Sequence, residues 1–272
     1  MSEVCKWLHE QLERLPMISH PFNLEDLPEN GIYFVYEEGE FWGHGGDQPR
    51  IVRVGSHTGQ GNLRSRVNET YLLDESKLGF GPKNPKPADR SIFRKNLGRA
   101  LLNRARDDYL RVWGIDFTER RHRDQFSRLR DMGREWRLEE TISGILRDRF
   151  SFRAIAVESP SSRSELEKRI IGSLAGCERC MPSKGWLGRH SPKDRIREGN
   201  LWQVQNLSAD PIGPREGEAI QRAIRMAEEQ RIAHDNHKRY HVRHQRKTDR
   251  GPHRESPVLD DRAKALGDFR LE

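Results

Sequence analysis

Two short runs of strand-forming residues, Gly31–Tyr36 and Arg50–Gly55, constrain the fold of this chain more than any other feature. Most residues in both runs are β-branched, aromatic or otherwise apolar, and such residues favour strands. The segment between the runs is polar and contains four glycines, a composition typical of turns. We therefore predict an antiparallel hairpin with a long loop.

Helical spacing of apolar residues predicts several helices around this hairpin, and alternation predicts a third strand. The proline-rich stretch Gly79–Pro87 is predicted to be a loop, because proline lacks the backbone donor that helices and central strands need. Ser162 or Ser164 is expected to cap the helix that follows the third strand. The predicted helices are Glu3–Leu15, Asn62–Tyr71, Ser91–Arg106, Arg120–Arg147 with a break near Gly133, Ser164–Ala175 and Gly217–Arg231, and the third strand is Ser151–Val157.

The charge balance points to a basic protein. The 272 residues include 49 Lys and Arg against 42 Asp and Glu, a net charge of +7, which favours polyanions such as nucleic acid or acidic membrane surfaces. An ordinary basic soluble protein is the alternative. No apolar window is long enough to cross a bilayer, and residues 1–16 are too charged for a secretory signal. We expect no membrane association and a cytoplasmic location.

The chain divides by composition into two parts. Residues 1–210 carry the predicted elements that can form a core, and residues 211–272 form a basic, polar extension that is helical or partly disordered. Cys177 and Cys180 form a CxxC pair. A four-ligand zinc site would need His190 and Cys5 as well, and two small residues at a helix end are the simpler interpretation. Three cysteines without regular spacing fit a reducing compartment.

The ordered motifs resemble the GIY-YIG endonuclease superfamily. The first triplet is Gly31-Ile32-Tyr33, Arg53-Val54-Gly55 occupies the second, and Leu63–Arg66 opens the arginine-bearing helix. The resemblance covers roughly residues 30–207. It implies an α/β fold with a small three-stranded antiparallel sheet flanked by helices. The segments that look like blocks of bacterial members are Asp89–Leu101, Ser164–Leu174, Gly185–Ser191 and Asn200–Val204.

This resemblance implies metal-dependent hydrolysis of phosphodiester bonds in DNA. Glu167 corresponds to the family's single protein ligand for the divalent metal, and a lone carboxylate suits Mg²⁺ or Mn²⁺, which keep several waters. The alternative is a first-turn glutamate favoured by the helix dipole. Arg66 lies where the family keeps an arginine that grips the scissile phosphate, and a guanidinium offers two oxygens a planar fork.

The second triplet departs from the family pattern because Arg53 replaces its tyrosine. Tyr33 matches the first tyrosine, which contacts or deprotonates the attacking water in the family. His57 could act as the base instead, since histidine titrates near neutral pH, and Arg53 could depress the pKa of the Tyr33 phenol. Both hypotheses stay open. We therefore expect Tyr33, Arg53, His57, Arg66 and Glu167 to form the catalytic site.

Basic residues on the helices that follow are candidates for nucleic-acid binding. Arg64 is expected to contact a backbone phosphate or to be a solvated charge. One predicted helix presents a basic face, for which a solvated surface is the alternative. Further arginines between Arg120 and Arg137 extend the surplus. The residues of the basic face are Arg90, Ser91, Arg94, Lys95 and Arg99.

Two other departures and two other functions remain open. Thr70 stands where many members have histidine or tyrosine, with Tyr71 beside it, and the bracing asparagine is Asn206 or Asn200, with Gln203 as a rival. The chain could bind nucleic acid without cutting it, or serve as the nuclease subunit of a restriction or anti-phage complex. DNA is the expected partner, with a protein partner or a homo-oligomer as further options.

Overall fold

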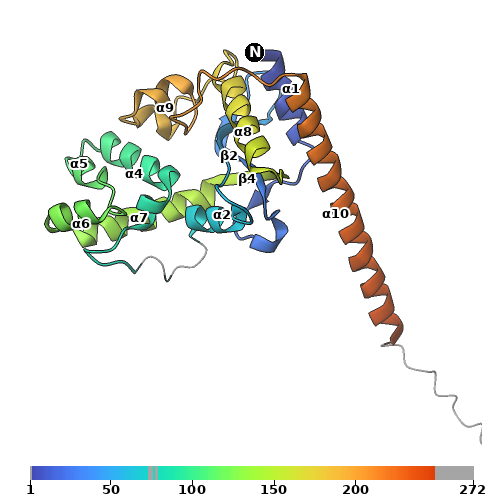
Figure 1. Cartoon of the computed structure of the whole chain (residues 1–272), viewed down its shortest axis with the longest axis horizontal. Coiled ribbons are helices and arrows are strands. Elements are labelled where there is room, and N and C mark those ends of the chain that lie inside the picture. The colour runs from blue at the N-terminus through green and yellow to red at the C-terminus, as the bar shows by residue number, and fades with distance from the viewer. Residues whose placement is uncertain (1, 73–75, 77–78, 249–272) are drawn as a thin grey trace, which may run out of the picture. The chain divides into compact units, whose positions relative to one another are not determined.

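The computed structural model describes residues 2–72, 76 and 79–248, with side chains described as far as residue 232 (Figure 1). Contacts divide the chain into Met1–Glu229 and Gln230–Glu272. The first unit therefore extends beyond the boundary expected at residue 210. The second unit contains the end of α10, and the expected tail beyond residue 248 lies outside the described residues.

A four-stranded antiparallel sheet in the order β1-β4-β2-β3 lies at the centre of the first unit. The predicted strands are confirmed as β2 (Gly31–Phe41), β3 (Pro49–Gly55) and β4 (Phe150–Ala156). The fourth strand, β1 (Ile18–Ser19), has only two residues and pairs with β4 at the edge. The expected three-stranded sheet is thus extended by a strand too short to give a periodic signal.

The helices match most of the predicted segments, and their bounds follow from local capping. The α8 helix begins at Pro160 because Ser159 caps it and accepts a hydrogen bond from the Ser162 backbone, so the expected caps Ser162 and Ser164 are wrong. The α10 helix is longer than expected. The helices are α1 (Ser2–Leu12), α2 (Leu63–Tyr71), α3 (Pro87–Arg90), α4 (Ile92–Arg104), α5 (Leu110–Trp113), α6 (Arg120–Phe126), α7 (Met132–Arg149), α8 (Pro160–Ala175), α9 (Asp194–Gly199) and α10 (Pro214–Thr248), with short 3₁₀ turns at Leu24–Asp26, Ser127–Leu129 and Leu187–His190.

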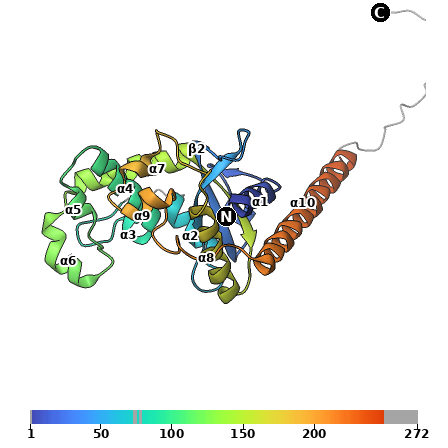
Figure 2. The same cartoon turned by 90° about the horizontal axis from the view of Figure 1, so that it is seen from above.

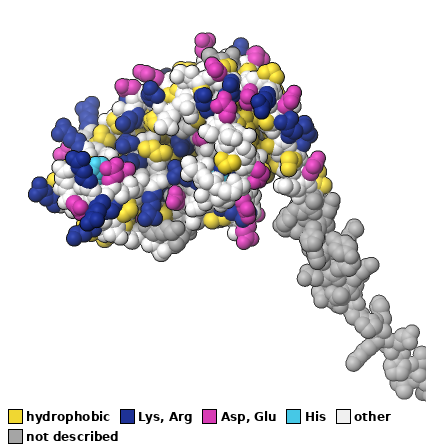
Figure 3. Space-filling model, in the orientation of Figure 1, with side chains coloured by type: hydrophobic (Ala, Val, Ile, Leu, Met, Phe, Trp, Pro, Cys, Tyr) yellow, Lys and Arg dark blue, Asp and Glu magenta, His cyan; other side chains and the backbone are white. Residues whose placement is uncertain are grey.

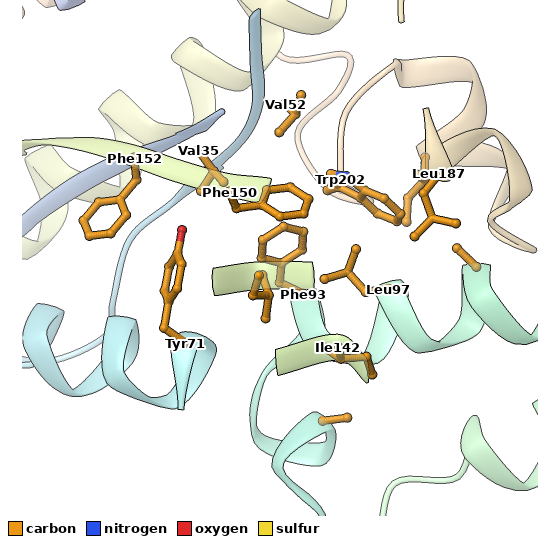
Figure 4. Close-up of a cluster of buried hydrophobic side chains, with 14 of the residues drawn as sticks. Val35, Val52, Tyr71, Phe93, Leu97, Ile142, Phe150, Phe152, Leu187 and Trp202 are labelled. Carbon is orange, nitrogen blue, oxygen red and sulfur yellow. The ribbon is translucent and has the colours of Figure 1, made fainter. Parts of the chain in front are cut away.

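Helices cover both faces of the sheet, which explains why Gly31–Tyr36 in β2 is an almost unbroken apolar run. Side chains alternate along a strand, so Tyr33 and Val35 enter one core cluster while Ile32 and Phe34 enter the other. The first cluster includes residues of α2, α4 and α7, and part of it is drawn in Figure 4. The second includes residues of α1, α8 and the first turns of α10.

The helices α4–α7 extend beyond the sheet, with α5 and α6 farthest from it in both views (Figures 1 and 2). Trp113 anchors this region. Its indole donates to the Lys95 carbonyl at 3.1 Å and packs against Gly98 so closely that a Cβ there would lie 2.4 Å from the ring. Among the described residues, no helix is long and apolar enough to cross a membrane.

Candidate active site

A cleft of about 550 Å³ opens where β3 ends, between α2 and α8. It brings together four of the five expected catalytic residues, Arg53, His57, Arg66 and Glu167, although Glu167 lies more than a hundred positions along the chain from the others. The remaining lining residues are Gly55, Ser56, Thr58, Asn62, Ser65 and Glu69.

Glu167 reaches the cleft from the middle of α8. Because that helix begins at Pro160, Glu167 lies roughly two turns inside it, and the interpretation as a first-turn glutamate is wrong. The Ser56 hydroxyl donates to one carboxylate oxygen of Glu167. Burial raises the pKa of Glu167, although the Ser56 hydrogen bond and the charges of Arg53 and Arg66 oppose that shift. The carboxylate therefore lies within the electrostatic influence of two cations.

Arg66 enters the cleft from α2, and its side chain is 27% exposed. Its Nη1 atom donates to the Arg90 carbonyl at 2.8 Å and to Glu69 Oε2 at 3.3 Å. These two contacts orient the guanidinium while leaving it in reach of solvent. The half-exposed position suits a cation that meets an incoming anion.

Arg53 is fixed more tightly. Its Nη1 atom donates to the Trp202 carbonyl at 2.6 Å and to Gln203 Oε1 at 2.7 Å, and its guanidinium lies 5.1 Å from the centre of the Phe93 ring. Gln203 also donates to the Val54 carbonyl at 2.9 Å. Of the three candidates for a bracing amide, the structure therefore places Gln203 against the site.

Asn200 and Asn206 instead occupy positions where the backbone adopts an unusual conformation. Both have positive φ angles, 54° and 62°, a conformation that asparagine tolerates better than most residues. The Asn200 side chain donates to Met181 rather than to a residue that lines the cleft.

Tyr33 lies beneath the cleft rather than in its wall. The side chain is 1% exposed, and it packs on Gly55 so closely that a Cβ at Gly55 would lie 2.5 Å from the phenol oxygen. Glycine at this position therefore lets the phenol lie next to the cleft. Tyr71 is not among the residues that line the cleft, and its ring packs against Phe22 and Phe152 in the core.

His57 joins the cleft to the start of β2. Its Nε2 atom accepts a hydrogen bond from the Gly31 backbone at 3.1 Å, which assigns the ring proton to Nδ1. Burial lowers the pKa of His57, and the charge of Arg163 lowers it further. The ring is thus neutral and its basic nitrogen is already engaged, an arrangement typical of a residue that positions backbone.

Arg163 holds the loop that carries His57. It is 1% exposed and donates to the carbonyls of His57 at 3.3 Å and of Gly59 at 2.6 Å. Since Arg163 and Glu167 belong to the same helix, α8 both fixes the loop after β3 and supplies the carboxylate beside it. Ser56, which no motif singled out, gives the second link between these segments.

The expected basic face on α4 does not exist as an exposed surface. Arg94 is 0% exposed and forms a buried ion pair with Glu139 at 2.7 Å, Lys95 pairs with Asp89 at 2.9 Å, and Ser91 is buried. The neighbouring helices α3 and α7 supply Asp89 and Glu139, and this enclosure could not be read from spacing along α4.

The other three residues expected to contact phosphate differ in their exposure and in their hydrogen-bond partners. Arg99 is half-buried and donates to Asn96 at 2.9 Å. Arg64 donates to the Leu27 carbonyl at 3.0 Å and so braces the segment before β2. Arg90 is exposed, and its backbone carbonyl accepts a hydrogen bond from the Arg66 side chain. Among the six expected contacts, Arg90 is thus the one with an exposed side chain next to the cleft.

The residues of the cleft fit a small divalent cation. Glu167 presents a carboxylate from α8, and Glu69 lines the same cleft from α2. Mg²⁺ prefers oxygen ligands and is commonly bound by one or two carboxylates with waters and substrate phosphate. The volume of about 550 Å³ leaves room for a hydrated ion and a phosphate. Nitrogen and sulfur ligands typical of zinc are not needed here.

Comparison with known proteins gives one match. A family model described as the GIY-YIG domain matches residues 3–230, which include all the elements that build the cleft. The match ends one residue after the boundary of the first compact unit. No curated protein and no solved structure matches the chain.

Proposed function

Because the chain belongs to the GIY-YIG family, whose domain implies a nuclease-type function, we propose that it is an endonuclease that hydrolyses phosphodiester bonds in DNA with Mg²⁺ or Mn²⁺. The observation that carries the proposal is the shared cleft. Its walls bring the Glu167 carboxylate together with the Arg53 and Arg66 guanidinium groups, a combination that suits an anionic ester and a cation at once.

The two arginines have different tasks in this proposal. Arg66 is half-exposed and would bind the scissile phosphate through its planar fork. Arg53 is held by Trp202 and Gln203 and would contribute a fixed positive charge near the phosphate. Because this charge is already fixed in place, the site need not reorganise when negative charge develops on the phosphoryl oxygens during the reaction.

Glu167 would hold the divalent cation, which when bound would stabilise charge on the phosphate and on the leaving oxygen. Ser56 orients the carboxylate by donating to one of its oxygens. Because the carboxylate is rigid, the hydrogen bond from Ser56 also fixes the direction of the other carboxylate oxygen of Glu167. This role for Ser56 is comparable to the hydrogen bonds that commonly orient metal-binding carboxylates.

Tyr33 is the better candidate for handling the attacking water. Its phenol oxygen lies against Gly55, which lines the cleft. His57 would have to release the Gly31 backbone before its Nε2 atom could accept a proton. We therefore assign the proton transfer to Tyr33 and a positioning role to His57.

Glu167→Gln tests this proposal directly, and Glu165→Gln is the matched control because it removes the same charge from an exposed position on the same helix. Plasmid and single-stranded DNA would be incubated with each variant in Mg²⁺, Mn²⁺ or EDTA. We expect wild type and Glu165→Gln to nick DNA only with metal, and Glu167→Gln to be at least about 100-fold slower. Equal rates for all three would refute the proposed metal ligand.

A binding module that does not cut is the second candidate, favoured by the arginine at the second triplet. Arg53 removes one of the two phenols of the family pattern and could hold phosphate without helping hydrolysis. The same assay separates the candidates, because a module would bind DNA in EDTA and show no metal-dependent nicking by the wild-type chain.

A further inference from the structure

Three cysteines and one histidine meet on the side of the sheet that faces α1 and α8. They are Cys5 in α1, His44 in the loop between β2 and β3, and Cys177 and Cys180 just after α8. One ligand atom from each lies within 4.8 Å of the other three. Cys5 Sγ lies 3.6 Å from Cys180 Sγ, and Cys177 Sγ lies 3.4 Å from His44 Nε2.

These distances match the edges of a tetrahedral zinc site. With zinc–sulfur bonds of about 2.3 Å and zinc–nitrogen bonds of about 2.0 Å, tetrahedral geometry places two sulfur ligands about 3.8 Å apart, and sulfur and nitrogen about 3.5 Å apart. Thiolate and imidazole ligands select zinc over Mg²⁺ or Ca²⁺, which prefer oxygen.

We propose that Cys5, His44, Cys177 and Cys180 bind a structural zinc ion. Four protein ligands complete a tetrahedral shell and leave no position for substrate, which distinguishes a structural zinc site from a catalytic one. The site is chemically distinct from the oxygen-lined cleft at Glu167. It would join α1, the β2–β3 loop and the carboxyl end of α8.

The packing around the cluster supports His44 as the fourth ligand. Gly43 approaches the segment between the two cysteines so closely that a Cβ would lie 1.7 Å from the Arg179 carbonyl oxygen. Glycine thus allows the loop to bring His44 against Cys177. The Nδ1 atom of His44 is buried and has no hydrogen-bond partner among the described residues, so no hydrogen bond at that nitrogen holds the ring in another position.

His9 is the nearest rival and is already occupied. Its Nδ1 atom lies 2.9 Å from the Cys5 carbonyl, and its Nε2 atom accepts from the Ile51 backbone at 3.1 Å. With Nε2 accepting, Nδ1 carries the proton and donates to Cys5. His9 therefore supports the backbone of a ligand rather than binding metal itself.

The histidine that the sequence offered for a zinc site, His190, is not the one in the cluster. His190 is exposed in a 3₁₀ turn and is absent from the cluster of described residues. His44 lies more than a hundred positions before the CxxC pair, so no local spacing links them. The helix-end interpretation of Cys177 and Cys180 does not account for the adjacent thiol of Cys5.

Metal analysis of the purified chain under reducing conditions tests the proposal. We expect one zinc ion per wild-type chain, at least about tenfold weaker zinc binding in His44→Ala and Cys177→Ser, and full zinc content in the control His190→Ala. Glu167→Gln should also retain its zinc, which separates this site from the proposed catalytic metal whatever the cleavage assay shows.

Cobalt replacement of zinc in the wild-type chain gives a second readout that does not depend on how a variant folds. Three thiolates should produce intense visible and near-ultraviolet bands of tetrahedral cobalt, and zinc should displace them. Absence of bound zinc together with failure of the reduced chain to bind added zinc would overturn the proposal. A disulfide between Cys5 and Cys180, found by mass spectrometry of non-reduced protein, would also overturn it.

Discussion

Replacing Arg94 by Met tests whether this arginine stabilises the fold or binds nucleic acid. Arg94 donates to Glu139 Oε2 through Nε at 3.0 Å and through Nη2 at 2.7 Å, and neither side chain is exposed. Its guanidinium also donates to the Thr70 carbonyl and to the Ser143 hydroxyl. Methionine would fill much of the space and remove every one of these donors.

The expected loss of stability follows from the Glu139 carboxylate, which the substitution would leave buried without its partner. Removing one partner of a buried ion pair costs about 3–5 kcal/mol of unfolding free energy, against a total of about 5–15 kcal/mol for a typical domain. Burial already raises the pKa of Glu139, and Arg94 opposes that shift, so Glu139 should become protonated in the variant. In Arg94→Met/Glu139→Gln the uncompensated charge is gone, and the oxygen of the introduced amide can still accept from the Ala88 backbone, as the carboxylate does. We expect the double variant to recover part of the loss.

Urea unfolding and the salt dependence of DNA binding measure the two roles separately. An exposed phosphate contact would reduce the slope of binding against salt by about one and would change stability by less than about 0.5 kcal/mol. We expect the reverse for Arg94→Met, namely a large loss of stability and an unchanged slope for the folded fraction. A stable variant with a reduced slope would refute the assignment of Arg94 to the core.

Three other predictions concern the site and the sheet. Tyr33→Phe should slow cleavage by about 100-fold, while His57→Gln, whose amide oxygen can still accept from the Gly31 backbone, should stay within about tenfold; the opposite order of rates would assign the proton to His57. Gly55→Ala should lower kcat/KM by about 100-fold, because the added Cβ would lie 2.3 Å from the Tyr33 ring; an unchanged kcat/KM would show that the phenol is not needed there. Burial raises the pKa of Glu37 from the ordinary value of 4.5 to about 7. Between these two pH values the folded chain keeps a proton that the unfolded chain loses. The free energy of unfolding therefore falls as pH rises through this range. Glu37→Gln should remove this loss of about 3 kcal/mol in urea unfolding compared near pH 5 and pH 8; an equal pH dependence in both proteins would contradict the assignment.

Local sequence patterns were sufficient for most of the secondary structure. The hairpin of β2 and β3, the helix α2 and the strand β4 follow from apolar spacing and turn residues within each segment. The two-residue strand β1 carries too few residues for such a signal. The start of α8 was missed because Ser159 and Pro160 supply its cap and first turn ahead of the apolar periodicity.

The site depends on pairings that no local pattern contains. The resemblance singled out Arg66 and Glu167, and the cleft does bring them to one place, while their catalytic roles stay predictions. The support of the site was foreseen only in part, because Gln203, one of three candidates for the bracing residue, contacts Arg53 from a distant segment, whereas no motif singled out Ser56, which donates to Glu167. Such contacts are set by packing between elements, which a single sequence does not specify.

The arginines show most clearly how composition and structure differ in what they imply. The chain has 49 Lys and Arg, and guanidinium groups were expected to face phosphate. Many instead donate to backbone carbonyls inside the protein, because one guanidinium offers several N–H donors. The buried ones are Arg50, Arg53, Arg94, Arg130, Arg153 and Arg163.

Only the exposed Lys and Arg side chains can therefore interact with a polyanion. Arg120 in α6 has a side chain that is 88% exposed and lies 3.8 Å from Asp124. It lines a hollow with three basic residues in all, together with Lys83 and Arg123, and with Asp124 and Ser127. Lys and Arg side chains are also prominent on the part of the surface in Figure 3 that corresponds to α5 and α6 in Figure 1. Because exposed charge acts on a polyanion over about a Debye length, the α6 surface is better placed than α4, among the helices whose side chains are described, for its positive charge to assist association with nucleic acid.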